Sequence, residues 1–191
     1  MTASERREQL LDVTAEIAGV QGFHRVSIES VARGAGITRA LVYQHFGDLQ
    51  TLLEAAIERE ADRALAQVSE TAPSDLSQGD PLDLLLESLG AYLRAVEEHP
   101  TRWRLVLMPP QGAPESLHEH IATGRAEVLA LLTQAVRPAL AAEGDPPDAE
   151  LTARVLAAFA DEYARLVLTD PDRYPPERLL EHARWFLQHA R

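Results

Sequence analysis

Apolar side chains recur every three or four residues along most of the chain, which is the pattern of helices that bury one face. Leu10, Val13, Thr14 and Ile17 form such a stripe in a first helix expected over residues 4–20. We find no convincing run of alternating apolar and polar residues, the pattern of a half-buried strand. The sequence therefore predicts an all-α protein of about nine helices.

Capping and turn residues divide this pattern into segments. Thr2 and Glu5 have the spacing of a capping box, and Gly22 is expected to end the first helix. Two short helices should follow it. The remaining predicted helices cover residues 48–70, 81–99, 103–108, 114–140, 149–168 and 176–188, with loops at 72–80 and 144–148.

The stretch from residue 27 to residue 53 carries the most specific pattern. Ser27, Thr38 and Asp48 each stand where a helix should begin, so we expect their side-chain oxygens to cap backbone N–H groups. Gly36 lies where the chain must reverse through a left-handed turn, a conformation that glycine adopts readily. The helix before this turn should bury Ile28, Val31, Ala32 and Ala35. This arrangement predicts a helix-turn-helix, whose second helix lies in the major groove of DNA.

The residues of this stretch also resemble a known family. The matching segments are Val31-Ala32, Ala35-Gly36-Ile37-Thr38, Val42-Tyr43-Gln44-His45-Phe46 and Leu52-Leu53. In this order they resemble the DNA-binding motif of the TetR family of transcriptional regulators. The resemblance implies a helix-turn-helix DNA-binding domain over residues 1–47 and a larger helical domain, for effector binding and dimerisation, over residues 48–191.

The motif and the resemblance together identify candidate DNA-contacting residues. They are Ser27, Thr38, Arg39, Ala40, Leu41, Tyr43, Gln44 and His45. Arg39 is second in the recognition helix, where a bidentate contact to guanine is its expected role. Tyr43 should touch the DNA backbone or a thymine. Gln44 either bonds adenine or faces solvent, and His45 either contacts phosphate or is a partly buried structural residue.

Two positions depart from the family pattern. Leu41 replaces a small hydroxyl residue of the recognition helix and is expected to contact a thymine methyl group. Leu49 stands where the family usually has a phosphate-binding lysine, and it continues the apolar stripe of the next helix instead. We therefore expect general affinity for DNA to be lower than in typical relatives.

The charge of the chain is acidic overall but unevenly placed. The formal net charge of the 191 residues is −12, yet residues 1–47 are neutral and residues 25–45 carry Arg25, Arg33 and Arg39 against Glu29. An acidic remainder repels DNA everywhere except at the helix-turn-helix, which orients the protein. The chain has no cysteine, no long apolar run and no signal-peptide core, so we expect a cytoplasmic protein without disulfides or a membrane span.

The resemblance implies that the larger domain binds a small, mostly apolar effector. Candidate lining residues are Tyr92, Trp103, Leu107, Met108, His120, Phe159 and Tyr163. It also implies a homodimer that binds a palindromic DNA operator, since one recognition helix reads too few bases alone. The last two helices have broad apolar faces, which serve either as a monomer core or as a dimer interface. Candidate interface residues are Leu151, Val155, Phe159, Leu179, Ala183 and Phe186.

Enzymatic function is disfavoured by the motifs. The chain lacks a glycine-rich phosphate loop and a serine or cysteine nucleophile motif, and His118 and His120 do not share a helix face. We therefore predict no catalytic residues, metal or cofactor. The predicted function is a TetR-type regulator, acting as a repressor, which a ligand releases from its operator. Two alternatives stay open: regulation by a protein partner, or a ligand-binding helical dimer with weakened DNA binding.

Overall fold

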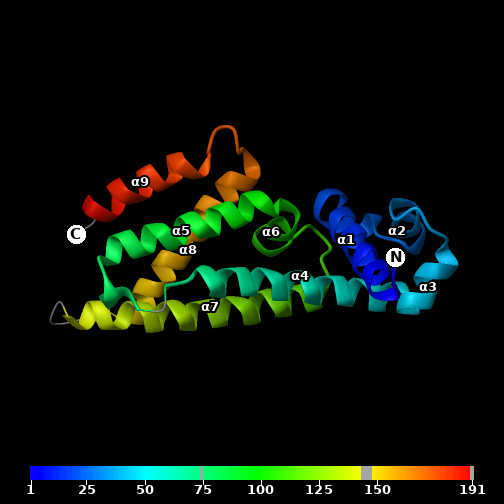
Figure 1. Cartoon of the computed structure of the whole chain (residues 1–191), viewed down its shortest axis with the longest axis horizontal. Helices are drawn as coiled ribbons and strands as arrows, with labels where there is room; N and C mark the ends of the chain where they lie inside the picture. The colour runs from blue at the N-terminus through cyan, green and yellow to red at the C-terminus, as the bar shows by residue number, and fades with distance from the viewer. Residues whose placement is uncertain (74, 143–147, 190–191) are drawn as a thin grey trace. The chain divides into compact units, whose positions relative to one another are not determined.

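The structure is a computed structural model that describes residues 1–73, 75–142 and 148–189 (Figure 1). Within these residues the chain forms α-helices and short 3₁₀ turns and no strand, so the predicted all-α class is confirmed. The helices are α1 (Ala3–Gln21), α2 (Ile28–Gly34), α3 (Arg39–Phe46), α4 (Leu49–Thr71), α5 (Pro81–Glu98), α6 (Pro100–Leu107), α7 (Glu115–Ala142), α8 (Ala149–Thr169) and α9 (Pro176–His189). The 3₁₀ turns are η1 (Phe23–Arg25) and η2 (Leu76–Gln78).

Most helix limits agree with the prediction to within two residues. Helix α6 was expected at 103–108 but begins three residues earlier, at Pro100. A proline is well suited to a first helical position because its fixed φ is helical and its missing N–H has no partner there. The two 3₁₀ turns were not predicted. Of the loop predicted at 144–148, all but Asp148 lies outside the described residues.

Both ends of α1 form as predicted. The backbone N–H of Glu5 donates to Thr2 Oγ1 at 3.2 Å, and the backbone N–H of Thr2 donates to Glu5 Oε2 at 2.7 Å. This reciprocal capping box satisfies donors that a helix N-terminus otherwise leaves without partners. At the other end, Gly22 has a φ of 90° and its N–H donates to the carbonyl of Ala18.

The chain packs into two compact units. Unit 1 comprises Met1–Ala64 with Thr101–Ala122, and unit 2 comprises Leu65–Pro100 with Thr123–Arg191. Unit 1 is therefore discontinuous in sequence, because a later segment folds with the first 64 residues. This division by packing differs from the functional division at residue 47, which stays a prediction.

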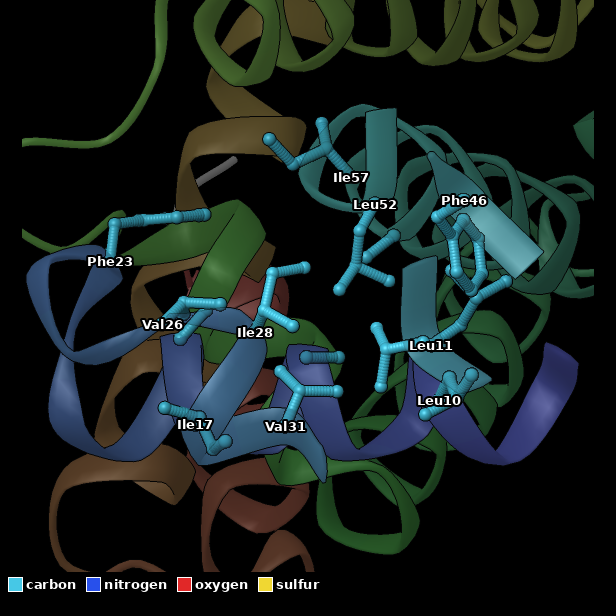
Figure 2. Packing of buried hydrophobic residues seen from close by; sticks show 14 of the residues in the cluster. Leu10, Leu11, Ile17, Phe23, Val26, Ile28, Val31, Phe46, Leu52 and Ile57 are labelled. Carbon is cyan, nitrogen blue, oxygen red and sulfur yellow. The ribbon is translucent and has the colours of Figure 1, made fainter. Parts of the chain in front are cut away.

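The core of unit 1 is built from α1 to α4 together with residues of α6 and α7. Figure 2 shows Leu10, Leu11, Val31, Phe46 and Leu52 converging from four helices. The later segment completes this core with Leu105, Leu117 and Ile121. Helix α2 can approach α1 closely because Gly34 has no side chain: a Cβ there would lie 2.7 Å from Val13 Cγ1. The predicted inner face of α2 is buried, as expected.

Unit 2 is organised around α5, which packs against α8 and α9. Leu93 and Val96 of α5 are fully buried. Gly90 lets α9 approach α5, since a Cβ at this position would lie 3.3 Å from Leu180 Cδ1. Arg184 of α9 pairs with Asp83 of α5 at 3.0 Å on the exposed side. Among the described helices, each is too short or too polar to cross a membrane.

Candidate nucleic-acid interface

Helices α2 and α3 meet through the predicted turn. Gly36 has a φ of 66°, which places it in the left-handed region that favours glycine. The turn is closed by backbone hydrogen bonds from Gly36 N to Arg33 O at 3.2 Å and from Ile37 N to Ala32 O at 2.9 Å. A short helix, a tight turn and a second short helix thus form a helix-turn-helix, with α3 as the recognition helix.

Helix α3 has one buried face and one exposed face. Val42 and Phe46, four residues apart, are buried in the core of unit 1, as predicted. The exposed residues are Arg39, Ala40, Tyr43 and Gln44, while Leu41 and His45 are half-buried. Tyr43 is 51% exposed, a large fraction for an aromatic side chain. Four of the predicted DNA-contacting residues therefore lie on one surface that is open to a groove of DNA.

The capping predictions at this site have different outcomes. Ser27 Oγ accepts from the N–H of Ser30 at 3.0 Å, and Asp48 Oδ1 accepts from the N–H of Thr51 at 2.8 Å. The Thr51 bond also lowers the pKa of Asp48. For Thr38 the prediction is wrong, since its side chain makes no capping hydrogen bond. The Thr38 backbone carbonyl instead begins α3 by accepting from Leu41 N–H at 3.1 Å, and its hydroxyl group stays exposed.

Two side chains of α1 hold the recognition helix and the turn before it. The Arg7 guanidinium lies 4.3 Å from the centre of the Phe46 ring, and Nη1 donates to the backbone carbonyl of His45 at 3.4 Å. Gln9 Nε2 donates to the carbonyl of Ala35 at 3.4 Å. Sequence reasoning missed both residues, because a polar residue on a helix gives no sign of which carbonyl it bonds.

The charges of this surface agree with the sequence count, in which Glu29 offsets one of the three arginines. Arg33 Nη2 pairs with Glu29 Oε1 at 2.8 Å, so these two charges largely cancel. Arg39 makes no ion pair with any described residue and remains available to DNA. Leu49 packs against the core of unit 1, as its place in the apolar stripe predicted.

The candidate effector residues lie in both units. Trp103 and Leu107 are buried in unit 1, with His120 half-buried and Met108 exposed just after α6 ends. In unit 2, Tyr92 and Tyr163 are buried, and the Phe159 ring centre lies 4.4 Å from that of Tyr163. An effector cavity lined by these residues stays a prediction.

Unit 2 also contains a partly buried polar cluster that sequence reasoning missed. The Tyr92 hydroxyl donates to Asp161 Oδ1 at 3.4 Å, with Arg125 and Arg165 at 3.8 and 3.7 Å from Asp161 Oδ2. Burial raises the pKa of Asp161 and, with the Asp161 charge, raises the pKa of Tyr92 well above its ordinary value. The sequence pattern of any one helix does not reveal this cluster, because its members come from α5, α7 and α8.

The candidate interface residues fall into two groups. Leu151 and Val155 of α8 and Phe186 of α9 are exposed, and Phe186 stacks on half-buried Phe159 with ring centres 5.4 Å apart. Leu179 and Ala183 are buried inside the protomer itself, because this face of α9 lies within unit 2. The apolar stripe of α9 thus serves the monomer core and an exposed surface at once. Within the described residues, we find no group of acidic and histidine side chains suited to a metal.

Comparison with known proteins identifies the helix-turn-helix. Residues 10–56 match the model of a family described as bacterial regulatory proteins, tetR family. Over these residues, which contain the helix-turn-helix, the chain is similar to that family. The HTH-type transcriptional repressor KstR of Mycolicibacterium smegmatis is 32% identical over 96 residues, covering 50% of this chain and 46% of that protein. The activator FasR of the same organism is 26% identical over 102 residues, covering 53% and 45%. The chain therefore matches about half the length of these relatives.

Solved structures extend the similarity of fold to the whole chain. A TetR-like transcriptional regulator from Rhodococcus sp. RHA1 has a TM-score of 0.72 at 23% identity, covering 97% of both chains. A Saccharomonospora viridis protein solved in complex with choline has a TM-score of 0.71 at 22% identity, also covering 97% of each. The fatty acid degradation regulator FadR from Bacillus halodurans scores 0.70 at 15% identity, covering 95% of this chain and 97% of that one. The fold of the chain is therefore the fold of these solved proteins.

The different capping of α2 and α3 predicts a difference in stability. Ser27→Ala should lower the free energy of unfolding by about 1 kcal/mol, because it removes a side-chain acceptor from the N-terminus of α2. Thr38→Ala should change it by less than about 0.5 kcal/mol, as is usual for an exposed position without such a bond. Urea unfolding followed by circular dichroism measures both. Equal losses in the two variants would contradict the structure.

Proposed function

We propose that this TetR-family chain is a transcriptional repressor that binds a palindromic DNA operator as a homodimer and is released by a small molecule. The observation that carries the proposal is the exposed face of α3, where Arg39, Tyr43 and Gln44 stand on a helix fixed by buried Val42 and Phe46. A rigid helix with polar and aromatic groups on its open side suits direct reading of base edges.

The proposed division of roles follows the exposure of each residue. Arg39 binds guanine through two hydrogen bonds, and Tyr43 and Gln44 contact the bases or backbone one turn further along. Thr38, whose hydroxyl is not used in capping, donates to phosphate together with Ser27 and His45. Ala40 and Leu41 provide apolar contact to thymine methyl groups.

Replacing Arg39 tests this proposal directly. Arg39→Ala should weaken binding to the operator by at least roughly 10- to 100-fold, because each protomer of the proposed homodimer loses one bidentate base contact. Fluorescence polarisation with labelled duplexes from the region upstream of the gene measures the affinity, and competitor DNA separates specific from non-specific binding. Arg173→Ala is the matched control, because it removes an exposed arginine from unit 2. If Arg39→Ala binds as the native protein does, base reading lies elsewhere.

The homodimer is proposed to form through the exposed apolar residues of α8 and α9. Leu151 is 60%, Val155 68%, Trp185 57% and Phe186 42% exposed, which is unusual for side chains of this size on neighbouring helices. A two-fold axis across this surface would let each helix cover its symmetry mate, and two recognition helices would read two half-sites.

A charge placed on this surface should separate the protomers. Val155→Glu is expected to give monomers at micromolar concentration and to abolish tight operator binding, because an unpaired carboxylate is costly to bury. Light scattering after size-exclusion chromatography measures the mass. Val20→Glu on α1 is the matched control, since Val20 is also exposed, at 59%. A Val155→Glu protein that remains dimeric would rule out this surface as the interface.

Release by a small molecule is proposed from the fold, because a chain with the same fold was solved with choline. Within unit 2, the candidate residues Tyr92, Phe159 and Tyr163 are all aromatic, and the rings of Phe159 and Tyr163 are in contact. An effector weakens operator binding only if it binds the DNA-incompetent state more tightly.

Choline and a series of fatty acids are the first effectors to test, given the regulators that share this fold. We expect one of these classes to raise the melting temperature and to lower operator affinity in the same concentration range. Differential scanning fluorimetry and polarisation measure the two effects. A ligand that stabilises the protein without weakening operator binding would contradict release.

A further inference from the structure

An acidic side chain is buried where the helical pattern of α4 demands an apolar one. Glu60 is only 6% exposed and follows Leu53 and Ile57 on the inward face of the helix. Its Oε1 atom accepts from Arg59 Nη2 at 2.7 Å, and its Oε2 atom accepts from Arg102 Nε at 2.9 Å. A carboxylate remains buried only with such partners, so the two arginines and Glu60 depend on one another.

Arg59 connects these residues of α4 to helix α1. Its Nη1 atom donates to the backbone carbonyl of Glu8 at 3.2 Å and to Glu8 Oε2 at 3.0 Å, and its Nη2 atom lies 2.8 Å from Asp12 Oδ1. Arg63 Nη2 adds a second bond to Glu8 Oε2 at 2.9 Å. We call Glu8, Asp12, Arg59, Glu60, Arg63 and Arg102 the charge network; it joins α1, α4 and α6 inside unit 1.

The turn of α1 that contains Glu8 also contacts the recognition helix. Glu8 stands between Arg7, which contacts His45 and Phe46 at the end of α3, and Gln9, which bonds the turn before α3. A shift of this turn therefore moves the contacts made by Arg7, Glu8 and Gln9 together.

At its other end the network is anchored to α6, which packs tightly on α1. Thr101 Oγ1 donates to Glu16 Oε2 at 2.7 Å. A Cβ on Gly19 would lie 2.9 Å from Thr101 Cγ2, so only glycine permits this approach. Arg102, the next residue, is held in place by this packing.

We propose that the charge network is a relay that sets the position of the recognition helix from α6, with Arg102 and Glu60 as positioning residues for operator binding although neither lies on the DNA-reading face. The proposal rests on the proposed function for its effect on DNA. When α6 is displaced, Arg102 moves away from Glu60, and the buried Glu60 carboxylate binds Arg59 more closely. Arg59 then loses its hydrogen bonds to Glu8, which lies beside the residues that contact α3. Ion pairs of this kind are either made or broken, which suits a switch between two arrangements.

Operator binding gives the first test in the full-length protein. Arg102→Gln and Glu60→Gln should each weaken binding to the upstream duplex at least tenfold, and the double variant should be no weaker than the poorer single variant. This non-additivity is expected because both changes break the same pair, Arg102 with Glu60. Arg173→Gln, which removes the same charge from unit 2, should bind as the native protein does. Additive losses, or unchanged affinity in a folded Arg102→Gln protein, would overturn the relay.

Hydrogen exchange gives a second test that does not need DNA. In Arg102→Gln and Glu60→Gln, backbone amides of residues 36–47 should exchange several-fold faster than in the native protein, while those of α5 and α9 should not change. Faster exchange confined to α4 and α6 would show that the network only fastens these two helices, and would overturn the relay. Glu60→Gln keeps the shape of the side chain, so it serves if Arg102→Gln fails to fold.

The two measurements separate the relay from the function on which it rests. If the native protein binds no upstream duplex specifically, the proposed function fails, and the exchange of residues 36–47 still decides the relay. If operator binding is specific but neither readout responds to Arg102→Gln, the function stands and the relay is wrong.

Discussion

The arrangement of unit 1 depends on one buried charge. Glu60 is only 6% exposed, and a buried ionised carboxylate without partners is strongly unfavourable. Its partners come from α4 itself and from α6, and Arg59 extends the set to α1. Apolar packing tolerates small shifts between helices, whereas hydrogen-bonded ion pairs require particular distances and directions. The network therefore selects one arrangement of three helices from the several that a leucine-rich core would accept.

The recognition helix benefits most from this selection. Helix α3 has eight residues, and a helix this short is not stable alone in water. Val42 and Phe46 supply its apolar attachment, and Arg7 and Gln9 fix its end and the turn before it. Arg39, Ala40, Tyr43 and Gln44 can then stay exposed, because none of them is needed for packing. Stability and recognition are thus assigned to opposite faces of one short helix.

Much of this architecture could be predicted from local sequence. Helical periodicity predicted the helices and the buried face of α2, and the residue types at Gly22, Gly36, Ser27 and Asp48 predicted caps and a turn, because these depend on neighbours within four residues. The failures are of another kind. Thr38 has the right residue type for a cap, but its side chain makes no capping hydrogen bond and only its backbone carbonyl accepts one. Arg102 meets Glu60 across 42 positions, which no periodicity predicts. One indication of this contact was present in the sequence, namely the acidic residue Glu60 in the apolar stripe of α4. Leu179 and Ala183 show the same limit: an apolar stripe does not tell a protomer core from a surface.

The discontinuity of unit 1 has a consequence for how such genes are recombined. A domain exchange that cut the chain after the fourth helix would transfer the DNA-reading face without Leu105, Leu117 and Ile121, which complete its core. It would also leave Glu60 without the guanidinium of Arg102. Segment 101–122 therefore has to be transferred together with the first 64 residues if the core of unit 1 is to stay complete.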